Sequence, residues 1–355
     1  MLGFRAVADP TLDDILSHVS RSFYLSLAVL PKSVRAQVSV AYLVARAADT
    51  IADSRVIEPA RRQQLLSSLR AGVEDPEKAL SLGADVEREL VSQEGGCTPS
   101  EQALLIRLSE CLQKLSAMES GDRVRAQKVL STLITGMDRD LARFPAPKRG
   151  QDWAGPPVAL STLAELEEHA YFAAGCVGEY WTTMTASHVE GLSRLQRPDF
   201  VARGVRLGKA LQYVNVIRDT PRDLVEGRCY LPTELLAPRG LVAADLRDPI
   251  TRKRARPVLA ELGRICLRHV DAAFPYVMAI PRTEPRLRLA ALWPLWIGLS
   301  TLEALGACED PLDPAAPVKI ARSQVYRIMA ESLVVVTSDT LLSRAHQRRR
   351  KAADS

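Results

Sequence analysis

The chain has 355 residues, of which 47% are apolar, and its 47 Lys and Arg against 42 Asp and Glu give a formal net charge of +5. This composition can bury a large core, and the mild, scattered basic charge argues against nucleic-acid binding while suiting an anionic substrate or a membrane surface. The length would allow two domains, but no stretch looks like a flexible linker. We predict one domain over 1–345 and a basic, disordered tail over 346–355.

Three features bear on the compartment. The six cysteines show no C-x-x-C pair and no zinc-like Cys/His spacing, so we expect free thiols in a reducing cytoplasm. The first ten residues lack the apolar segment of a signal peptide. The longest apolar stretch, 289–307, contains Pro294 and Glu303, so we expect a buried helix there and not a membrane span.

Turn residues divide the chain into helical segments, and no alternating strand pattern occurs. Thr11 and Asp14 fit a capping box that opens a helix to about residue 26, and Pro31 fits the first turn of the next helix. Thr98 or Ser100 would cap a helix over 101–117. We expect further helices at about 59–73, from 76 onward, and at 120–144, 160–185, 197–220, 258–277, 284–305 and 321–345. The predicted fold class is therefore all-α.

The helix that follows Pro31 carries a polar line on an apolar background. Four residues at spacings of four, three and four share one face: Tyr42, Arg46, Asp49 and Asp53. Two carboxylates one turn apart repel each other, and a bound cation relieves that repulsion. Carboxylate oxygens suit Mg²⁺, which proteins usually share with substrate phosphates. The alternative is an ordinary solvated acidic pair.

A second helix repeats the pattern. Its polar residues again fall in register: Gln212, Asn215, Asp219 and Asp223. Asn and Asp can present oxygen to a metal, while Arg218 and Arg222 can bind phosphate oxygens. Two such helices could flank one cavity and hold a diphosphate through Mg²⁺.

Five segments, in this order, resemble motifs of the squalene/phytoene synthase family: 20–24, 49–53, 173–178, 215–223 and 227–232. The resemblance extends over about residues 12–345. It implies a single helical bundle of the isoprenoid synthase type around a central cavity. It also implies Mg²⁺-dependent head-to-head condensation of two allylic isoprenoid diphosphates.

The resemblance assigns roles to particular residues. The implied catalytic residues are Asp49, Asp53, Asp219, Asp223 and Tyr171. The implied metal ligands are Asp49, Asp53, Asn215, Asp219 and Asp223. The implied substrate-binding residues are Ser20, Arg21, Tyr42, Arg46, Gln212, Asn215 and Arg218. The family usually has a tyrosine where this chain has His169; Tyr171 lies two residues on, about 200° around the helix. His169 or the diphosphate itself could take over that role.

The product stays open at this point. Squalene would form from two farnesyl diphosphates through presqualene diphosphate, with NADPH as reductant. Phytoene or dehydrosqualene would form from two geranylgeranyl or farnesyl diphosphates without reduction. The segment 274–281 favours squalene.

Two rival functions differ in class. A head-to-tail prenyltransferase or class I terpene cyclase usually carries a denser D-D-x-x-D run, and a non-catalytic relative tends to lose the acidic residues. We also expect a monomer that is cytoplasmic, with peripheral contact to the inner face of the membrane through the basic tail.

Overall fold

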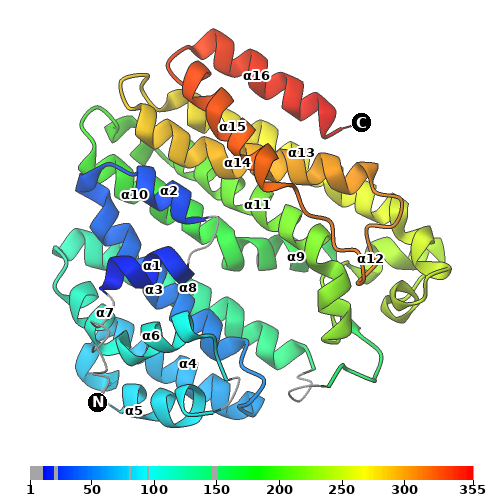
Figure 1. Ribbon diagram of the computed structural model, residues 1–355, viewed down its shortest axis with the longest axis horizontal. Coiled ribbons are helices and arrows are strands. Elements are labelled where there is room, and N and C mark those ends of the chain that lie inside the picture. The colour runs from blue at the N-terminus through cyan, green and yellow to red at the C-terminus, as the bar shows by residue number, and fades with distance from the viewer. Residues whose placement is uncertain (1–10, 20–22, 80, 94–95, 146–150, 355) are drawn as a thin grey trace, which may run out of the picture.

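Secondary structure is almost entirely helical in the part of the chain that the structure describes, which confirms the all-α prediction. The structure, a computed structural model, describes residues 11–19, 23–79, 81–93, 96–145 and 151–354. Most N-terminal helices gather at one end of the molecule, but α2 (Phe23–Val29) packs against α14 (Pro285–Ala307). The long helices α11 (Pro198–Val225), α13 (Arg256–Ala279) and α14 run side by side through the other part (Figure 1).

The N-terminal part contains eight of the helices: α1 (Leu12–Val19), α2 (Phe23–Val29), α3 (Lys32–Ala52), α4 (Pro59–Glu74), α5 (Leu82–Val86), α6 (Pro99–Ile106), α7 (Leu108–Ser116) and α8 (Ser120–Arg143). A short 3₁₀ turn (Pro76–Ala79) and a π turn (Glu87–Val91) join them. The predicted caps are present, because Asp14 N–H donates to Thr11 and Glu101 N–H donates to Thr98. Helix α3 packs against α4, α7 and α8, which fixes the direction of its polar face.

The central part contains α9 (Leu163–Ala170), α10 (Cys176–His188), α11 (Pro198–Val225), the short α12 (Thr233–Leu236), α13 (Arg256–Ala279) and α14 (Pro285–Ala307). A π turn, Tyr171–Gly175, joins α9 to α10 where one continuous helix was predicted. Short 3₁₀ turns lie at Ser193–Gln196, Ala237–Arg239, Ala243–Arg247 and Thr251–Ala255. Helix α11 runs five residues beyond its predicted end, with Pro221 inside it.

Small residues let α10 and α11 pack closely. A methyl group on Gly178 would lie 1.9 Å from the carbonyl oxygen of Gly204, and one on Gly208 would lie 2.1 Å from that of Ala174. The backbones therefore meet with no room for side chains between them. This contact fixes the position of α11, and with it the second acidic motif.

A two-residue parallel ladder connects the end of α11 to the segment before α9. Strand β1 (Val158–Ala159) pairs with β2 (Arg228–Cys229). Gly227 precedes β2 with a φ of +83°, a conformation that other residues rarely adopt. Alternate residues of an extended chain share a side, so Arg228 and Tyr230 project together.

The predicted disorder of the tail at 346–355 is wrong through Ala352. The segment predicted as one helix over 321–345 is two, α15 (Arg322–Val335) and α16 (Asp339–Ala352). Leu342 and His346 are buried, and the Arg350 guanidinium donates two hydrogen bonds to Asp271 at 2.9 and 3.0 Å. These tertiary contacts hold α16 in place, and they could not be predicted from the basic composition of the tail.

Helix α14 is long and apolar enough to cross a membrane by length and composition, and it is the one such helix among the described residues. However, 72% of its most apolar window is buried inside the protein. Trp296 at its centre is fully buried, which agrees with the predicted core helix.

Candidate functional site

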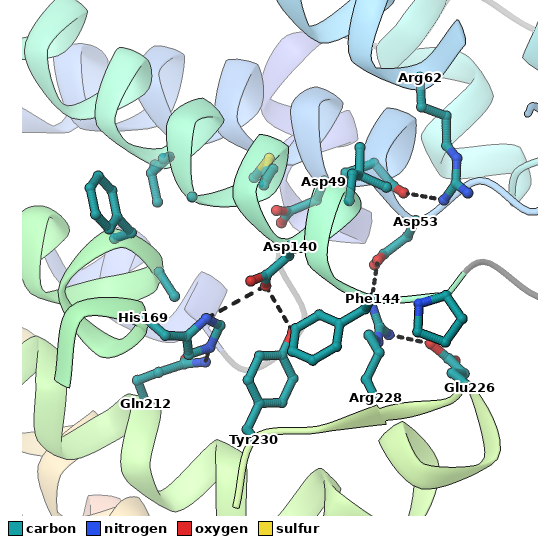
Figure 2. Close-up of a pocket in the computed structure, with 18 of the residues that line it drawn as sticks. Asp49, Asp53, Arg62, Asp140, Phe144, His169, Gln212, Glu226, Arg228 and Tyr230 are labelled. Carbon is teal, nitrogen blue, oxygen red and sulfur yellow. Dashed lines mark hydrogen bonds and ion pairs between the residues drawn. The ribbon is translucent and has the colours of Figure 1, made fainter. Parts of the chain in front are cut away.

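A cavity of about 310 Å³ opens between α3, α8, α9, α11 and the segment after α11 (Figure 2). Its walls combine a carboxylate-rich side with an apolar, aromatic side. The charged and polar lining residues include Asp49, Asp53, Arg62, Asp140, His169, Gln212, Glu226, Arg228 and Tyr230. Its apolar lining residues include Leu133, Met137, Phe144, Phe172 and Ala173. An anionic group and an apolar chain could thus bind in one continuous site.

Asp49 and Asp53 reach the cavity from the last turns of α3, as predicted. Burial at this position, followed by repulsion from Asp53, raises the pKa of Asp49 to about 7. Water still reaches 46% of the Asp49 side chain, so the energetic consequence of this pKa shift is smaller than for a dry site. Two neighbouring carboxylates favour a proton or a cation between them.

Arg228 connects the two acidic motifs. Its guanidinium lies 3.8 Å from an Asp53 oxygen and 3.6 Å from an Asp223 oxygen, and it also bonds to Glu226. Figure 2 shows this side chain beneath Asp53, with Glu226 beside it. The first and second motifs, 170 residues apart in sequence, therefore meet at the guanidinium of Arg228.

The second motif lies at the edge of the cavity. Asp223 is 14% exposed, and burial raises its pKa to about 7 against the opposing effect of Arg228. Asp219 is bound by its neighbour Arg218 through two hydrogen bonds of 2.8 and 2.6 Å. The Asn215 side-chain amide donates to Gln212 Oε1 at 3.4 Å, and Gln212 lines the cavity. Neither Asp219 nor Asp223 lines the cavity, although Asp223 contacts Arg228, which does.

The opposite side of the cavity contains a hydrogen-bonded cluster. The Tyr230 hydroxyl donates to Asp140 Oδ2 at 2.8 Å, and His169 Nδ1 lies 3.5 Å from the same oxygen. The His169 and Tyr230 ring centroids are 4.2 Å apart. The amide nitrogen of Gln212 lies 3.1 Å from His169 Nε2. Burial and the neighbouring Asp140 raise the pKa of Tyr230 well above its usual value, so its hydroxyl stays a donor.

The predicted cation has to fit these donors. Within the described residues, no three His, Cys, Asp or Glu side chains gather as a ready-made metal site. Arg228 instead lies between Asp53 and Asp223, and burial raises the pKa values of Asp49 and Asp223 to about 7. Mg²⁺ usually takes one or two carboxylates and completes its shell with water and phosphate oxygens. The donor set fits Mg²⁺ bound together with a diphosphate.

Several predicted residues lie away from the cavity. The Tyr171 hydroxyl donates to Glu179 at 3.2 Å and faces a separate surface hollow, so the structure does not bring this predicted catalytic residue into the site. The π turn begins at Tyr171, two residues after His169, and of these two residues His169 lines the cavity. Arg46 binds Glu101 at 2.6 Å and lies 3.7 Å from Asp49.

The remaining predicted substrate-binding residues add little to the cavity. Tyr42 is half-buried, and its hydroxyl is 3.5 Å from the carbonyl oxygen of Val19. Ser20 and Arg21 lie outside the described residues.

The sequence prediction assigned no site role to Arg228, Asp140 or Tyr230, although Arg228 and Tyr230 lie in the segment 227–232 that resembles a family motif. For Asp140 a signal existed, because Gly136, Asp140 and Phe144 recur every fourth residue and all three line the cavity. For Arg228 and Tyr230 the signal was alternation in an extended segment, which is too short to identify without its partner strand.

Comparisons with known proteins agree with this arrangement. The family model described as squalene/phytoene synthase matches residues 16–324. The squalene synthase of Schizosaccharomyces pombe is 24% identical over 322 residues, which is 90% of this chain and 64% of that protein. The 15-cis-phytoene synthase of Enterobacter agglomerans is 31% identical over 169 residues, which is 45% of this chain and 52% of that protein. The chain spans 35% to 64% of the length of the first four curated relatives.

Solved structures share the fold. A complex of TcSQS with the ligand BPH1237 superposes with a TM-score of 0.74 at 22% identity, covering 96% of this chain and 90% of that chain. A dehydrosqualene synthase in complex with a ligand gives a TM-score of 0.56 at 19% identity, covering 92% and 95%. These likenesses support the isoprenoid synthase type of helical bundle predicted for the chain.

Proposed function

This chain belongs to the squalene/phytoene synthase family, and from that premise we propose that it is a prenyltransferase that joins two allylic isoprenoid diphosphates head to head. The observation that carries the proposal is the meeting of the two acidic motifs at Arg228, which lines the cavity and lies between Asp53 and Asp223. The aromatic wall beyond them suits the apolar chain of such a substrate.

The position of each residue around the cavity suggests its role. Asp49, Asp53, Asp219 and Asp223 would hold Mg²⁺, with Asn215 beside them. Bound Mg²⁺ supplies charge neutralisation for the departing diphosphate. Arg218 and Arg228 would bind diphosphate oxygens, since guanidinium groups match them in geometry and charge. The Phe144 and Phe172 side of the cavity would exclude water from the allylic cation.

For the product, we propose squalene, formed from two farnesyl diphosphates through presqualene diphosphate with NADPH as reductant. Phytoene or dehydrosqualene is the second candidate, because the relatives include a phytoene synthase at 31% identity. Peripheral contact with an anionic membrane would let the apolar product leave, although Arg349 and Arg350 of the basic tail are engaged by Glu331 and Asp271.

The test is to incubate the purified chain with farnesyl or geranylgeranyl diphosphate and Mg²⁺, with and without NADPH, and to analyse the hydrocarbon extract by mass spectrometry. Squalene that forms only with NADPH would support the leading proposal. Dehydrosqualene regardless of NADPH, or product from the C20 substrate alone, would support the second. A head-to-tail product would contradict both.

A further inference from the structure

Helix α15 has a second apolar face, which is exposed to solvent on the side opposite to α14. The inner face of α15 is fixed, because Ile328, Ser332 and Val335 are buried. The indole Nε1 of Trp293 on α14 donates to Ser332 Oγ at 2.8 Å. Figure 1 shows α15 and α16 as an outer layer over α14. The exposed side of α15 is therefore part of a packed helix and not a frayed end.

Large apolar side chains occupy the exposed side of α15. Tyr326, Leu333 and Val334 are 65%, 60% and 73% exposed. With 3.6 residues per turn, these three side chains fall within about 100° of one another around the helix. Other exposed apolar side chains in the described chain, such as Ile106 and Ile250, lie on other segments. Three such side chains on one helix face form a patch of the kind that marks a contact surface.

Arginines border this patch on both sides. Around the helix, Arg322 lies next to Leu333, and Arg327 lies next to Val334. Both arginines are exposed, and neither has an ion-pair partner within the described residues. We call the surface formed by these side chains the α15 face; its members are Arg322, Tyr326, Arg327, Ala330, Leu333 and Val334.

The positive charge of the chain is concentrated in the layer that contains this face. Residues 322–352 include seven Lys and Arg and two Asp and Glu, a net charge of +5 that equals the net charge of the whole chain. Both acids are engaged, because Glu331 pairs with two arginines of α16 and Asp339 lies 2.8 Å from Arg288 of α14. The rest of the chain is neutral on balance, so an anionic partner is attracted to the α15–α16 layer.

Charge distinguishes between two kinds of partner for the α15 face. If two copies of the chain met through this face, Arg322 and Arg327 of one copy would approach the same arginines of the other, and the face contains no acid to pair with them. An anionic bilayer instead offers phosphate groups to the arginines and an apolar interior to the side chains between them. Tyr326 suits that boundary, since its ring is apolar and its hydroxyl is polar.

We propose that the α15 face binds the surface of an anionic phospholipid bilayer, with its apolar side chains inserted among the acyl chains and its arginines on the lipid phosphates. The inference rests on the proposed function for its purpose, because an apolar hydrocarbon product has to leave into a bilayer. It assigns the membrane contact to a folded helix face in place of the basic tail at 346–355. Binding itself requires neither substrate nor Mg²⁺.

The test is co-sedimentation of the purified full-length chain, without substrate, with vesicles of phosphatidylcholine alone or mixed equally with phosphatidylglycerol. We expect the chain to bind the mixed vesicles at least about tenfold more tightly than the neutral ones, and less tightly as salt is added. Val334→Asp should lower the partition coefficient for mixed vesicles about 30-fold, because it removes an inserted side chain and adds a repelled charge. Arg327→Gln should lower it about fivefold, the effect of one cation at such a surface.

Two control variants match these changes. Ile250→Asp alters a side chain that is 82% exposed and lies outside the α15 face. Lys78→Gln removes an exposed cation from the N-terminal part of the chain. Both variants should bind mixed vesicles within about twofold of the unaltered chain. Because all four altered side chains are exposed, circular dichroism should show the same helix content for every variant.

Vesicle binding that Val334→Asp and Arg327→Gln leave unchanged would overturn the inference. Light scattering that shows a dimer in the absence of vesicles, which Val334→Asp dissociates, would also overturn it and assign the face to a second copy of the chain. The proposed function fails separately: a chain that binds mixed vesicles through the α15 face but forms no head-to-head product would refute the proposed activity and leave the membrane contact standing.

Discussion

The two acidic helices carry the same pair of aspartates at the same spacing, yet their surroundings differ. On α3, Asp49 and Asp53 open toward the cavity, with side chains 46% and 61% exposed. On α11, Asp219 is held by Arg218, while Asp223 is nearly buried beside Arg228. Arg46 and Arg228 lie 3.7 and 3.8 Å from the α3 pair, whereas Arg218 lies 2.6 Å from Asp219, so the α3 pair is less closely neutralised by arginines than the α11 pair. Identical spacing in sequence does not produce identical electrostatics, because the counter-charges come from other segments.

The largest expected effect separates the two pairs directly. We predict that Asp53→Asn lowers the rate of diphosphate release by about a thousandfold, because it removes negative charge from the more open pair without changing its size. The loss of diphosphate release rate in Asp219→Asn should be about tenfold smaller, since Arg218 already offsets the charge of Asp219. The measurement is the release rate against Mg²⁺ concentration.

The control for this pair is Asp138→Asn, which removes a carboxylate on α8 that pairs with Arg70 at 3.0 Å and is not among the lining residues of the cavity. Its rate should stay within about twofold of the unaltered chain. Equal losses for Asp53→Asn and Asp219→Asn would show that the difference in surroundings has no functional weight.

Arg228 is the group that joins the two pairs, so its removal should affect stability more than any other charge here. Arg228→Gln leaves Asp53, Asp223 and Glu226 without their shared partner, and breaking such a buried pair typically costs about 3–5 kcal/mol. Urea unfolding would measure the loss. The control is the pair of Arg239 and Glu261, 3.3 Å apart, whose acidic partner is 32% exposed against 10% for Glu226, so Arg239→Gln should cost below about 1 kcal/mol.

Adding Asp223→Asn to Arg228→Gln removes one of the stranded charges. We therefore expect the double variant to be more stable than Arg228→Gln alone. A double variant as unstable as the sum of its parts would indicate that Arg228 acts through packing and not through charge.

The helices could be predicted because their apolar periodicity and caps are local. The polar face of α3 could be predicted equally well. That this face points into the protein could also be predicted, because apolar residues cover most of the rest of the helix. The site was readable only in part. Arg228 contacts residues far apart in sequence. Tyr171 was assigned through the resemblance, although its spacing from His169 already placed it on another face of the helix. The tail was wrongly predicted as disordered for the same reason, because Asp271 and Glu331, which bind its arginines, are distant in sequence.

The pH dependence of stability should also differ between the α3 and α11 pairs, although by less than the effects above. The pKa values of Asp49 and Asp223 are raised to about 7, from about 4 for an unfolded aspartate. The folded, metal-free protein therefore binds more protons than the unfolded chain between about pH 4 and 7. The resulting stabilisation is complete below about pH 4 and is lost as the pH rises through 7.

We predict that the melting temperature in EDTA falls between pH 5 and 8, and that Asp223→Asn flattens this fall more than Asp49→Asn. Asp223 is the less exposed of the two, so solvent screens its interactions less. Calorimetry at several pH values would test this. A slope that Asp223→Asn leaves unchanged would place the titrating groups elsewhere.

The smallest expected change in stability concerns Arg218, the residue that distinguishes the α11 pair. Its ion pair with Asp219 is well exposed, so Arg218→Gln should change the free energy of unfolding by less than about 1 kcal/mol. If Arg218 transfers from Asp219 to the substrate diphosphate, the same variant should raise KM about tenfold, as expected for one lost charge-assisted hydrogen bond. On α3 the balance reverses: Arg46 binds the less exposed Glu101, so Arg46→Gln should lose more stability than Arg218→Gln. An unchanged KM in Arg218→Gln would mean that this arginine serves only to neutralise Asp219, and that the α11 pair binds its cation without exchanging partners.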